Sequence, residues 1–456
     1  MQNILVIGAG KSTGILVSYL QEKSVEHQFT ITVGDVRLEQ AEQIIGNHEQ
    51  SNAISLDILD KNDLTQYVDQ ATVVISMLPA RFHIHVARVC LKLKKHMVTA
   101  SYVSEEMQAL DHMVKESGLV FMNEIGVDPG IDHMSAMQVI DRIRAEGGKM
   151  ILFESFTGGL VAPQSDNNLW NYKFTWNPRN VVVAGQGGVA KFIQEGKYKY
   201  IPYQRLFRRT EFLNVPDYGT FEAYANRNSL KYRDIYGIQD VLTLYRGTMR
   251  RVGFSKAWNV FVQLGMTDDS YILEDSSTMS YRDFMNSFLP YHPTDSVELK
   301  LRHNLKIDQD DVIWLKLKEL DLFNATKKIG IVDATPAQAL QKILTEKWSL
   351  DKDDKDMIVM YHKFGYELDG KKHQIDSTMV VQGENQVKTA MAKTVGLPVA
   401  MAAVRILTGE ISTPGVHLPI KEEIYTPILK ELTQYGIEFT ETKVPYLGYN
   451  MEDVTP

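Results

Sequence analysis

Cysteine is nearly absent from this sequence. Only Cys90 occurs in 456 residues, which excludes an internal disulfide framework and a zinc site built from cysteines. This usage fits a protein of a reducing compartment. Cys90 stands in "VARVCLKL", on the apolar face of an expected helix, so we expect a buried structural thiol.

Uninterrupted apolar stretches and blocks of positive charge are absent as well. The longest apolar stretch, "TAMAKTVGLPVAMAAVRIL", is broken by Lys393 and Arg405, so we expect no membrane span. The N-terminus enters a strand at once, so we expect no signal peptide. The net charge of −8 without a basic block disfavours nucleic acid as a partner. Together these features predict a cytoplasmic protein.

The rest of the composition is that of an ordinary globular enzyme. Apolar residues make up 44% and charged residues 23% of the chain, which argues against disorder. A chain of 456 residues is too long for a single hydrophobic core, so we expect two or three domains.

Residues 4–14, "ILVIGAGKSTG", contain two overlapping patterns. The letters "GKST" suggest the phosphate-binding loop of a nucleoside triphosphatase. That loop needs a glycine five residues before Gly10, and this chain has Leu5 there. Gly8 lies too close to Lys11 for the backbone to wrap a triphosphate. The spacing therefore excludes a triphosphatase loop.

The same stretch fits the pyrophosphate-binding turn of a dinucleotide fold. Ile4–Ile7 is a continuous apolar run, typical of a strand covered on both faces. Gly8 makes the tight turn and Gly10 lets the backbone approach the phosphates. Ser12 or Thr13 then opens a helix whose N-terminus faces them.

A second apolar strand strengthens the dinucleotide interpretation. "TITVGDVR" ends in Asp35, about twenty residues after the glycine turn, as in the dinucleotide fingerprint. A carboxylate at this position can accept hydrogen bonds from an adenosine ribose.

Strands and helices alternate up to about residue 127. The apolar runs "AISLDI", "TVVISML", "HMVTASY" and "GLVFMNE" are separated by helical segments such as 61–68 and 104–115. This alternation predicts an α/β fold with a doubly wound parallel Rossmann-type sheet. Ligands of such sheets bind beyond the carboxyl ends of the strands. The residues that follow the expected strands are Asp57, Leu78, Pro79, Ser101, Tyr102 and Asp128.

The alternation ends at Asp128-Pro129-Gly130. Asp132 is expected to cap a helix that starts near His133. "ILFESFTGG" and "NVVVAG" predict a second, mixed sheet, and "DDVIWLKLKELDLF" is typical of the helices that follow. We expect a dinucleotide-binding domain over 1–128, joined by a returning segment of about 390–456. An α/β substrate and dimerisation domain covers 129–264 and 351–389, and a mainly helical subdomain covers 265–350.

Four arginines gather in the middle of the chain: Arg227, Arg246, Arg250 and Arg251. Guanidinium groups recognise carboxylates through paired hydrogen bonds, so the cluster suggests a carboxylated substrate. The residues alone favour the simpler alternative that these arginines pair with nearby acids such as Glu222 and Asp234.

Longer motifs resemble one known family. "NEIGVDPGIDHMSA", "GGLVAPQSDNNLWNYKFTW", "NRNS" followed by "YRDIYGI", and "LYRGTMRRVGF" resemble saccharopine dehydrogenase of the glutamate-forming branch, also called saccharopine reductase. "DMIVMYHKFG" and "AKTVGLPVAMAAVRILTGEI" resemble the same family, and the order of the motifs is kept. The resemblance covers nearly the whole chain.

The resemblance implies two sets of binding residues. The cofactor-binding set is Gly8, Ala9, Gly10, Lys11, Ser12, Asp35, Val36, Arg37, Asp57, Ile58, Leu78, Ala100, Ser101, Val127, Asp128 and Pro129. The substrate-binding set is Ser101, Tyr102, Asp128, Arg227, Thr248, Met249 and Arg250. Saccharopine carries three carboxylates, so Arg227 and Arg250 suit this substrate, and the arginine cluster takes on a functional meaning.

The implied reaction oxidises the secondary amine of saccharopine by hydride transfer to NAD or NADP. Water then adds to the imine, and 2-aminoadipate 6-semialdehyde and L-glutamate are released, reversibly, in lysine metabolism. Such steps need a group that moves protons. Asp128 and Tyr102 are the expected catalytic residues, because both stand at strand ends; a turn-forming role for Asp128 and an orienting or packing role for Tyr102 are the alternatives.

Two positions depart from the family pattern. Thr157 stands where several members have cysteine, so a thiol role there is excluded. Members that use the phosphorylated cofactor tend to have Cys-Arg where this chain has Asp35-Val36. A carboxylate attracts a ribose 2′-OH and repels a 2′-phosphate, so we expect NAD to be preferred, although Arg37 could contact a phosphate.

Other expectations concern metals, partners and alternatives. His83 and His85 in "HIH" point apart on a helix, so we expect surface or packing histidines and no metal. A site role for His133 stays open. The family suggests a homodimer. The alternative functions are an amine dehydrogenase acting on lysine or a carboxylated polyamine, and a non-catalytic dinucleotide sensor.

Overall fold

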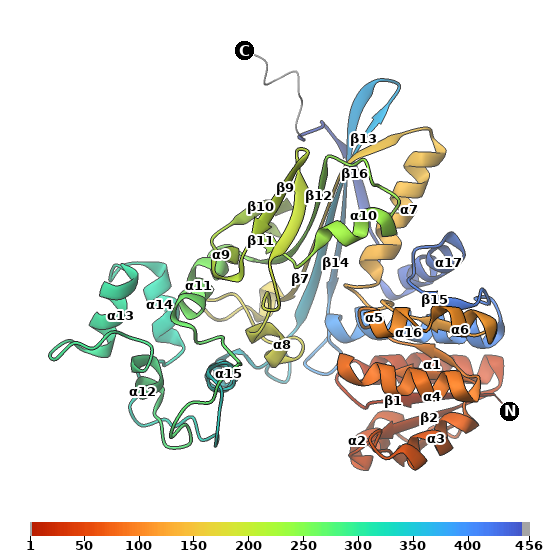
Figure 1. Cartoon of the computed structure of the whole chain (residues 1–456), viewed down its shortest axis with the longest axis horizontal. Coiled ribbons are helices and arrows are strands. Elements are labelled where there is room, and N and C mark those ends of the chain that lie inside the picture. Colours follow the sequence, from red (N-terminus) through yellow and green to blue (C-terminus); the bar gives the residue numbers. More distant parts are fainter. Residues whose placement is uncertain (1, 449–456) are drawn as a thin grey trace. The chain divides into compact units, whose positions relative to one another are not determined.

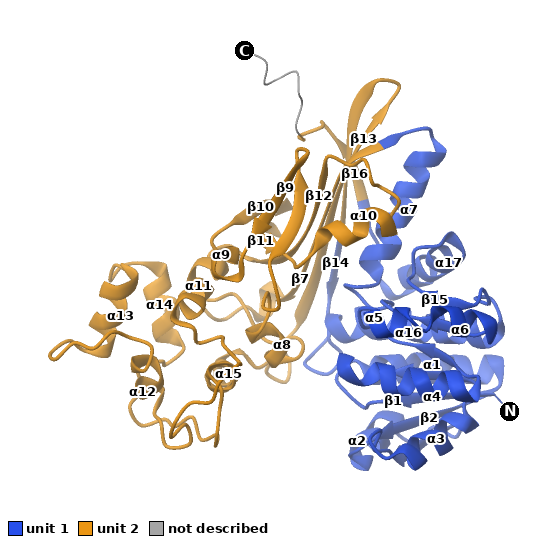
Figure 2. Cartoon of the chain, in the orientation of Figure 1, with its two compact units in different colours: residues 1–149, 379–440 blue, residues 150–378, 441–456 orange. Residues whose placement is uncertain are grey.

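The computed structural model describes residues 2–448, which form two compact units (Figure 2). Unit 1 comprises Met1–Lys149 and Met379–Thr440, and unit 2 comprises Met150–Thr378 and Glu441–Pro456. The division falls after helix α7 (Ile131–Ala145), whereas the sequence placed a boundary before it, at residue 128.

Unit 1 is built around a parallel sheet with the order β15-β6-β5-β4-β1-β2-β3 (Figure 1). The chain starts in the middle of the sheet, moves outward to β3 and crosses back to β4, which is the doubly wound topology expected from the sequence. Its strands are β1 (Gln2–Ile7), β2 (Phe29–Asp35), β3 (Ser51–Ser55), β4 (Val73–Ser76), β5 (His96–Val98), β6 (Val120–Met122) and β15 (Gly415–His417).

Helices cover both faces of this sheet because right-handed crossovers in opposite directions lie on opposite sides. On one face, Leu5 and Ile7 of β1 share a buried cluster with Leu64 of α3 and Cys90 of α4. The cysteine is fully buried, as expected. Together with α7, the helices of unit 1 are α1 (Thr13–His27), α2 (Leu38–Ile45), α3 (Lys61–Gln70), α4 (His83–Leu93), α5 (Glu105–Gln108), α6 (Asp111–Glu116), α16 (Ala390–Thr408) and α17 (Glu422–Leu432).

Helix α16 returns from the C-terminal part of the chain and packs on α1, β4 and β5. A Cβ atom on Gly396 would lie 2.8 Å from the carbonyl oxygen of Ser12, so the glycine allows close packing on the start of α1. By length and composition α16 could cross a membrane despite Lys393 and Arg405, so these charges do not exclude a span. However, 78% of the apolar stretch of α16 is buried inside the protein, which indicates a core helix.

Unit 2 contains a mixed sheet whose main path is β10-β11-β12-β7-β13-β14-β16, and β8 adds β9 beside β12. Strand β12 runs parallel to β7 and antiparallel to β11. The strands are β7 (Lys149–Val161), β8 (Ala190–Gln194), β9 (Lys197–Ile201), β10 (Thr210–Val215), β11 (Gly219–Ala225), β12 (Thr243–Arg251), β13 (Asp356–Leu368), β14 (Lys371–Gln382) and β16 (Thr440–Val444).

An aromatic cluster forms much of the core of unit 2. Trp170 stacks on Phe261 and meets Trp348 edge to face, and Phe254 stacks on Trp258. Such rings contribute large apolar areas to the core. The helices of this unit are α8 (Pro178–Val182), α9 (Tyr203–Leu206), α10 (Tyr232–Ile235), α11 (Phe254–Leu264), α12 (Tyr281–Asn286), α13 (Val297–Leu305), α14 (Val312–Glu319) and α15 (Pro336–Trp348).

Two local predictions were wrong. "NVVVAG" is not a strand but lies in and after α8, because Asn177 accepts a hydrogen bond from the backbone N–H of Arg179 and Pro178 starts the helix. Asp132 does not cap α7, which begins at Ile131; its carboxylate accepts the N–H of Gly130 within the preceding turn.

Candidate functional site

The glycine turn after β1 has the geometry of a phosphate-binding turn. Gly8 has a φ of +105°, and a Cβ atom there would lie 3.0 Å from the carbonyl oxygen of Met77. The N–H of Gly8 donates to the carbonyl of Gly34 at 2.8 Å. A side chain at position 8 would therefore separate β1 from its neighbours.

The turn leads into α1, which begins at Thr13 with Ser12 as the preceding residue. No atom would approach within 4 Å of a Cβ atom on Gly10, so the backbone faces open space there. Free N–H groups at a helix N-terminus attract phosphate. The turn therefore fits the pyrophosphate of a dinucleotide, which Gly10, Lys11 and Ser12 would hold.

Asp35 at the end of β2 is bound to the turn. One carboxylate oxygen accepts the N–H of Ala9 at 2.8 Å and the other accepts the N–H of Arg37 at 2.9 Å. Each oxygen has a second lone pair, so the carboxylate can still accept from ribose hydroxyls. Val36 and Arg37 are exposed beside it. These residues fit the adenosine side of a dinucleotide.

The other predicted cofactor residues lie beyond the same edge of the sheet. Leu78 approaches Gly8, and Ala100 approaches Gly126, next to Val127. Asp57 follows β3 and its carboxylate accepts the N–H of Leu59 at 2.9 Å. They follow parallel strands of one sheet, so their positions agree with the binding edge of a doubly wound fold.

A sharp turn between β6 and α7 carries Asp128. Gly130 has a φ of +146°, and a Cβ atom there would clash with the carbonyl oxygen of Gly126. The N–H of Gly126 donates to the carbonyl of Pro129 at 2.8 Å, which closes the turn. The phenolic OH of Tyr102 donates to the Asp128 carboxylate at 3.2 Å. The two expected catalytic residues are thus in contact.

A buried carboxylate joins this turn to the segment after β5. Glu124 is fully buried and accepts the N–H of Val103 at 3.0 Å, while its second oxygen lies 2.8 Å from Nε2 of His133. The backbone N–H of Glu124 donates to the carbonyl of Ser101 at 3.1 Å. His133 therefore helps to hold the buried carboxylate of Glu124 in place. Its other ring nitrogen, Nδ1, lies 3.7 Å from the carboxylate of Asp132.

His83 is a functional-site residue that the sequence did not reveal. It is buried, and its ring nitrogens lie 2.7 Å from Oγ of Ser101 and 2.8 Å from Oγ of Ser76. Burial lowers the pKa of His83 to about 4, so the ring is neutral near pH 7. His85 is exposed, as expected for the second histidine of the pair. The pattern alone could not distinguish this support of Ser101 from ordinary packing.

In unit 2 the arginine cluster separates into different environments. Arg250 is 4% exposed, and its guanidinium carbon lies 5.1 Å from the ring centre of Tyr172 and 5.4 Å from that of Phe254. One terminal nitrogen donates to the carbonyl of Met249, and Nε has no partner. Within residues 2–448, no acidic side chain forms an ion pair with Arg250. The group is arranged to receive an anion.

The other arginines of the cluster have different surroundings from Arg250. Arg251 points to the opposite face of β12 and donates to the carbonyl of Tyr218 at 2.7 Å. Arg246 is buried over the ring of Tyr232, and Arg227 is exposed with a φ of +42°. Glu222 does not serve this cluster as an ion-pair partner but accepts N–H groups at the start of α11. Thr248 and the buried Met249 lie on β12 between these arginines.

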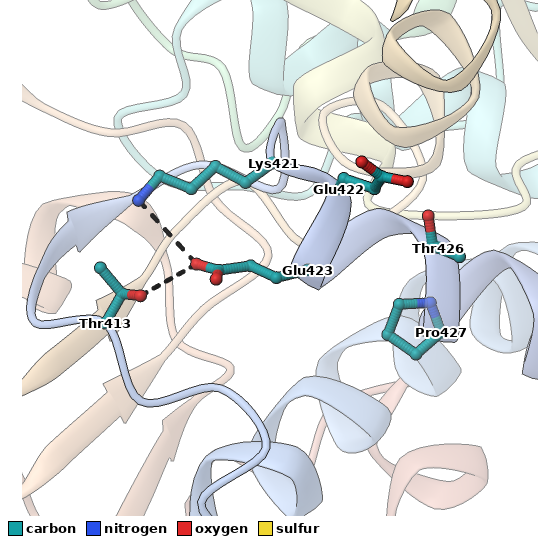
Figure 3. A pocket seen from close by; sticks show the side chains of 6 residues that line it. All are labelled: Thr413, Lys421, Glu422, Glu423, Thr426 and Pro427. Carbon is teal, nitrogen blue, oxygen red and sulfur yellow. Dashed lines mark hydrogen bonds and ion pairs between the residues drawn. The ribbon is translucent and has the colours of Figure 1, made fainter. Parts of the chain in front are cut away.

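A cavity of about 710 Å³ beside α17 is not a good alternative site. Three of its lining side chains contact one another: Glu423 contacts Lys421 and accepts a hydrogen bond from Thr413 at 3.0 Å (Figure 3). None of the residues expected to bind cofactor or substrate lines it.

Comparison with known proteins covers both units. Residues 4–122 match the family model described as the saccharopine dehydrogenase NADP binding domain, and residues 126–437 match that of the saccharopine dehydrogenase C-terminal domain. The L-glutamate-forming, NADP(+) saccharopine dehydrogenase of Saccharomyces cerevisiae is 33% identical, over 97% of this chain and 99% of its own.

Two further similarities extend this result. The solved structure of the apo, histidine-tagged yeast enzyme matches with a TM-score of 0.88 and 31% identity, covering 98% of this chain and all of that one. The alpha-aminoadipic semialdehyde synthase of Arabidopsis thaliana is 32% identical over 92% of this chain. The match spans 41% of that longer protein.

The burial of His83 predicts a pH dependence of stability. Its pKa of about 4 lies below the ordinary value of 6.5, so the unfolded chain binds a proton between these values that the folded chain does not. The contribution of the neutral His83 ring to the free energy of unfolding is fully present above pH 6.5, and it is lost as the pH falls below this value. We expect a loss of about 2 kcal/mol between pH 7.5 and pH 5. His83→Gln should lack this part of the loss, measured by chemical unfolding at both pH values.

The exposed His85 provides the matched control. His85→Gln removes an exposed histidine of the same helix, so a change in the pH dependence seen only in His83→Gln is assigned to the buried ring. Equal slopes for wild type and His83→Gln would contradict the neutral, buried state of this ring.

Proposed function

The chain belongs to the saccharopine dehydrogenase family, and we propose that it interconverts saccharopine with L-glutamate and 2-aminoadipate 6-semialdehyde in lysine metabolism. It is an oxidoreductase that uses a nicotinamide dinucleotide. The observation that carries the choice of substrate class is the buried guanidinium of Arg250, which has no acidic partner among residues 2–448. A carboxylated substrate supplies that partner.

The reaction balances as an oxidation followed by hydrolysis. The hydride would leave the carbon on the lysine-derived side of the secondary amine, and the nicotinamide dinucleotide, held by the turn at Gly10, Lys11 and Ser12, would supply its acceptor. The amine nitrogen loses its proton as the C=N bond forms. Water then adds to this bond, and the C–N bond breaks to give the aldehyde and the amine of L-glutamate. Each step after hydride transfer moves a proton, so the protein must hold an acid or base at the amine.

Asp128 is proposed as that acid or base. Its carboxylate is half-buried and accepts a hydrogen bond from the hydroxyl of Tyr102, which holds it at the edge of the sheet. Tyr102 then orients the carboxylate. Ser101, held by His83, is proposed to position substrate or cofactor near this pair.

The guanidinium of Arg250 is proposed to bind one carboxylate of saccharopine. Tyr172, Phe254 and Tyr224 surround it at 5.1 to 5.8 Å and exclude water, which strengthens a charge-assisted hydrogen bond. Thr248 and Met249 belong to the same strand, and Arg227 is proposed to contact a second, more exposed carboxylate.

We also propose that NAD is preferred over NADP, although the fungal relatives are named for NADP(+). Asp35 places a carboxylate where the adenosine ribose binds, and its two N–H contacts keep it directed at the turn. A 2′-phosphate would meet this negative charge. We further propose that the protein is a cytoplasmic homodimer. Sedimentation of the purified chain would test the dimer, and imaging of a tagged chain would test the location.

Replacing the carboxylate of Asp128 should slow turnover. Asp128→Asn keeps the shape and removes the basic oxygen, so we expect kcat for saccharopine oxidation to fall by roughly two to four powers of ten. The reduced cofactor and free glutamate would be measured together, with thermal unfolding as a check on folding. Asp69→Asn, an exposed acid on α3, is the control. A change confined to KM would make Asp128 a binding residue only.

Replacing Arg250 should weaken substrate binding specifically. Arg250→Gln is expected to raise the KM for saccharopine by about ten- to a hundredfold, the value of a charged hydrogen bond, and to leave the KM for NAD unchanged. Arg251→Gln on the opposite face of β12 is the matched control. If both variants raise the KM for saccharopine equally, Arg250 has no special role.

Cofactor choice should follow the charge at position 35. We expect kcat/KM to be about tenfold or more higher with NAD than with NADP, because the carboxylate repels the 2′-phosphate. Asp35→Asn removes the charge and keeps one of the two acceptors for the backbone N–H groups of Ala9 and Arg37, so it should reduce this ratio. A wild-type preference for NADP would overturn the proposal.

A further inference from the structure

Positive charge gathers on one short segment of unit 2. Residues 196–210 contain cationic side chains and no acidic one, although the whole chain has a net charge of −8. The segment includes β9 and α9 and leads into β10 (Figure 1). Its cations are Lys197, Lys199, Arg205, Arg208 and Arg209. Such an uncompensated group of charges favours an anionic partner.

Three of these arginines line a cavity of about 480 Å³, the arginine cavity, together with Tyr200 and the turn before α9. Arg209 is held in place, since it donates to the side chain of Gln194 at 3.2 Å and lies 5.2 Å from the ring centre of Phe192. Arg205 and Arg208 are exposed, and within residues 2–448 neither forms an ion pair. The cavity thus offers guanidinium groups without competing carboxylates, a suitable setting for phosphate.

Arg208 also lines a second cavity of about 320 Å³, the α11 cavity, so the two cavities adjoin. Helices α9 and α14 both contact α11 around it (Figure 1). One face of α11 contributes Lys256, Asn259, Val260 and Gln263, at the spacing of a single helical face. Its apolar wall consists of Phe207, Val260, Leu305, Ile307 and Ile313.

One polar group in the α11 cavity lacks a partner. Asn259 is 6% exposed, and its Oδ1 atom has no hydrogen bond. A buried amide oxygen without a partner costs free energy unless a ligand or water donates to it. A cavity that combines an apolar wall with such an acceptor suits a flat group that has N–H donors at its edge, as a nucleobase does.

We propose that the two cavities form one binding site for a nucleoside di- or triphosphate. The phosphates lie at Arg205 and Arg208, and the base lies in the α11 cavity with its N–H edge at Asn259. The two cavities have the sizes of small-ligand pockets. A simple polyphosphate would leave the apolar wall and Asn259 unused, and a fatty acid would leave the amide without a donor.

This site is separate from the residues assigned to the reaction. Neither Arg250, Thr248 nor Met249 lines either cavity, and Arg227 does not do so either. The inference therefore does not depend on the proposed substrate. A ligand here would act as an effector of this unit, whatever the chain oxidises.

Calorimetric titration with GTP tests the proposal. The full-length protein is used with saturating NAD, so that the dinucleotide turn is occupied. We expect saturable binding of GTP, and binding at least about tenfold weaker for guanosine or for tripolyphosphate alone. The Arg205→Gln/Arg208→Gln variant should weaken GTP binding by at least about tenfold, because it removes the phosphate contacts.

Asn259→Leu separates the two parts of the site. It should weaken GTP binding and leave tripolyphosphate binding unchanged, since only the base contacts the amide. Lys347→Gln, an exposed cation elsewhere in unit 2, should bind GTP within about twofold of wild type. Thermal unfolding confirms that each variant is folded.

Several outcomes would overturn the proposal. No saturable GTP binding at millimolar concentration, or equal binding by wild type and the double arginine variant, removes the site. Equal binding of GTP and tripolyphosphate removes the role of the α11 cavity. A smaller sedimenting species for the double arginine variant would instead assign these arginines to a contact between copies of the chain.

Discussion

The turn from Gly126 to Gly130 is the constraint on which the arrangement of unit 1's candidate site depends. A Cβ atom on Gly130 would clash with the Gly126 carbonyl, so only glycine permits the closed turn. The turn ends β6 and starts α7, and it presents Asp128 to Tyr102. Without this closure the carboxylate would have no fixed position at the edge of the sheet.

Buried hydrogen bonds extend this constraint to the neighbouring strand ends. Glu124 ties the turn to Val103, and His83 ties Ser101 to Ser76. These groups are enclosed, so breaking one bond leaves a polar atom without water as a substitute. The segment after β5 is therefore held to the segment after β6. The proposed catalytic role of Asp128 would need such rigid support, because proton transfer depends strongly on distance.

The charged side chains of the two candidate sites, Asp35 in unit 1 and Arg250 in unit 2, differ in their hydrogen-bond partners. In unit 1 the Asp35 carboxylate is satisfied by two backbone N–H groups, and it still has lone pairs for a ribose. In unit 2 the guanidinium of Arg250 is buried among aromatic rings with no ion pair inside the described residues. A buried charge without an ion pair is costly, and the proposed substrate carboxylate would supply the missing partner.

Local patterns in the sequence determined the parallel sheet of unit 1, the glycine turn after β1 and the position of Asp35 at the end of β2. These features depend on the spacing of neighbouring residues, and spacing is visible in one dimension. The family motifs added Asp128, Tyr102 and Arg250. Tertiary structure alone decided that His83 supports Ser101 and that Glu124 pairs with His133. It also decided that Arg250 and Arg251 have different surroundings, and that "NVVVAG" lies in and after a helix. Each of these outcomes depends on burial or on partners distant in the chain, and a linear pattern carries no information on either.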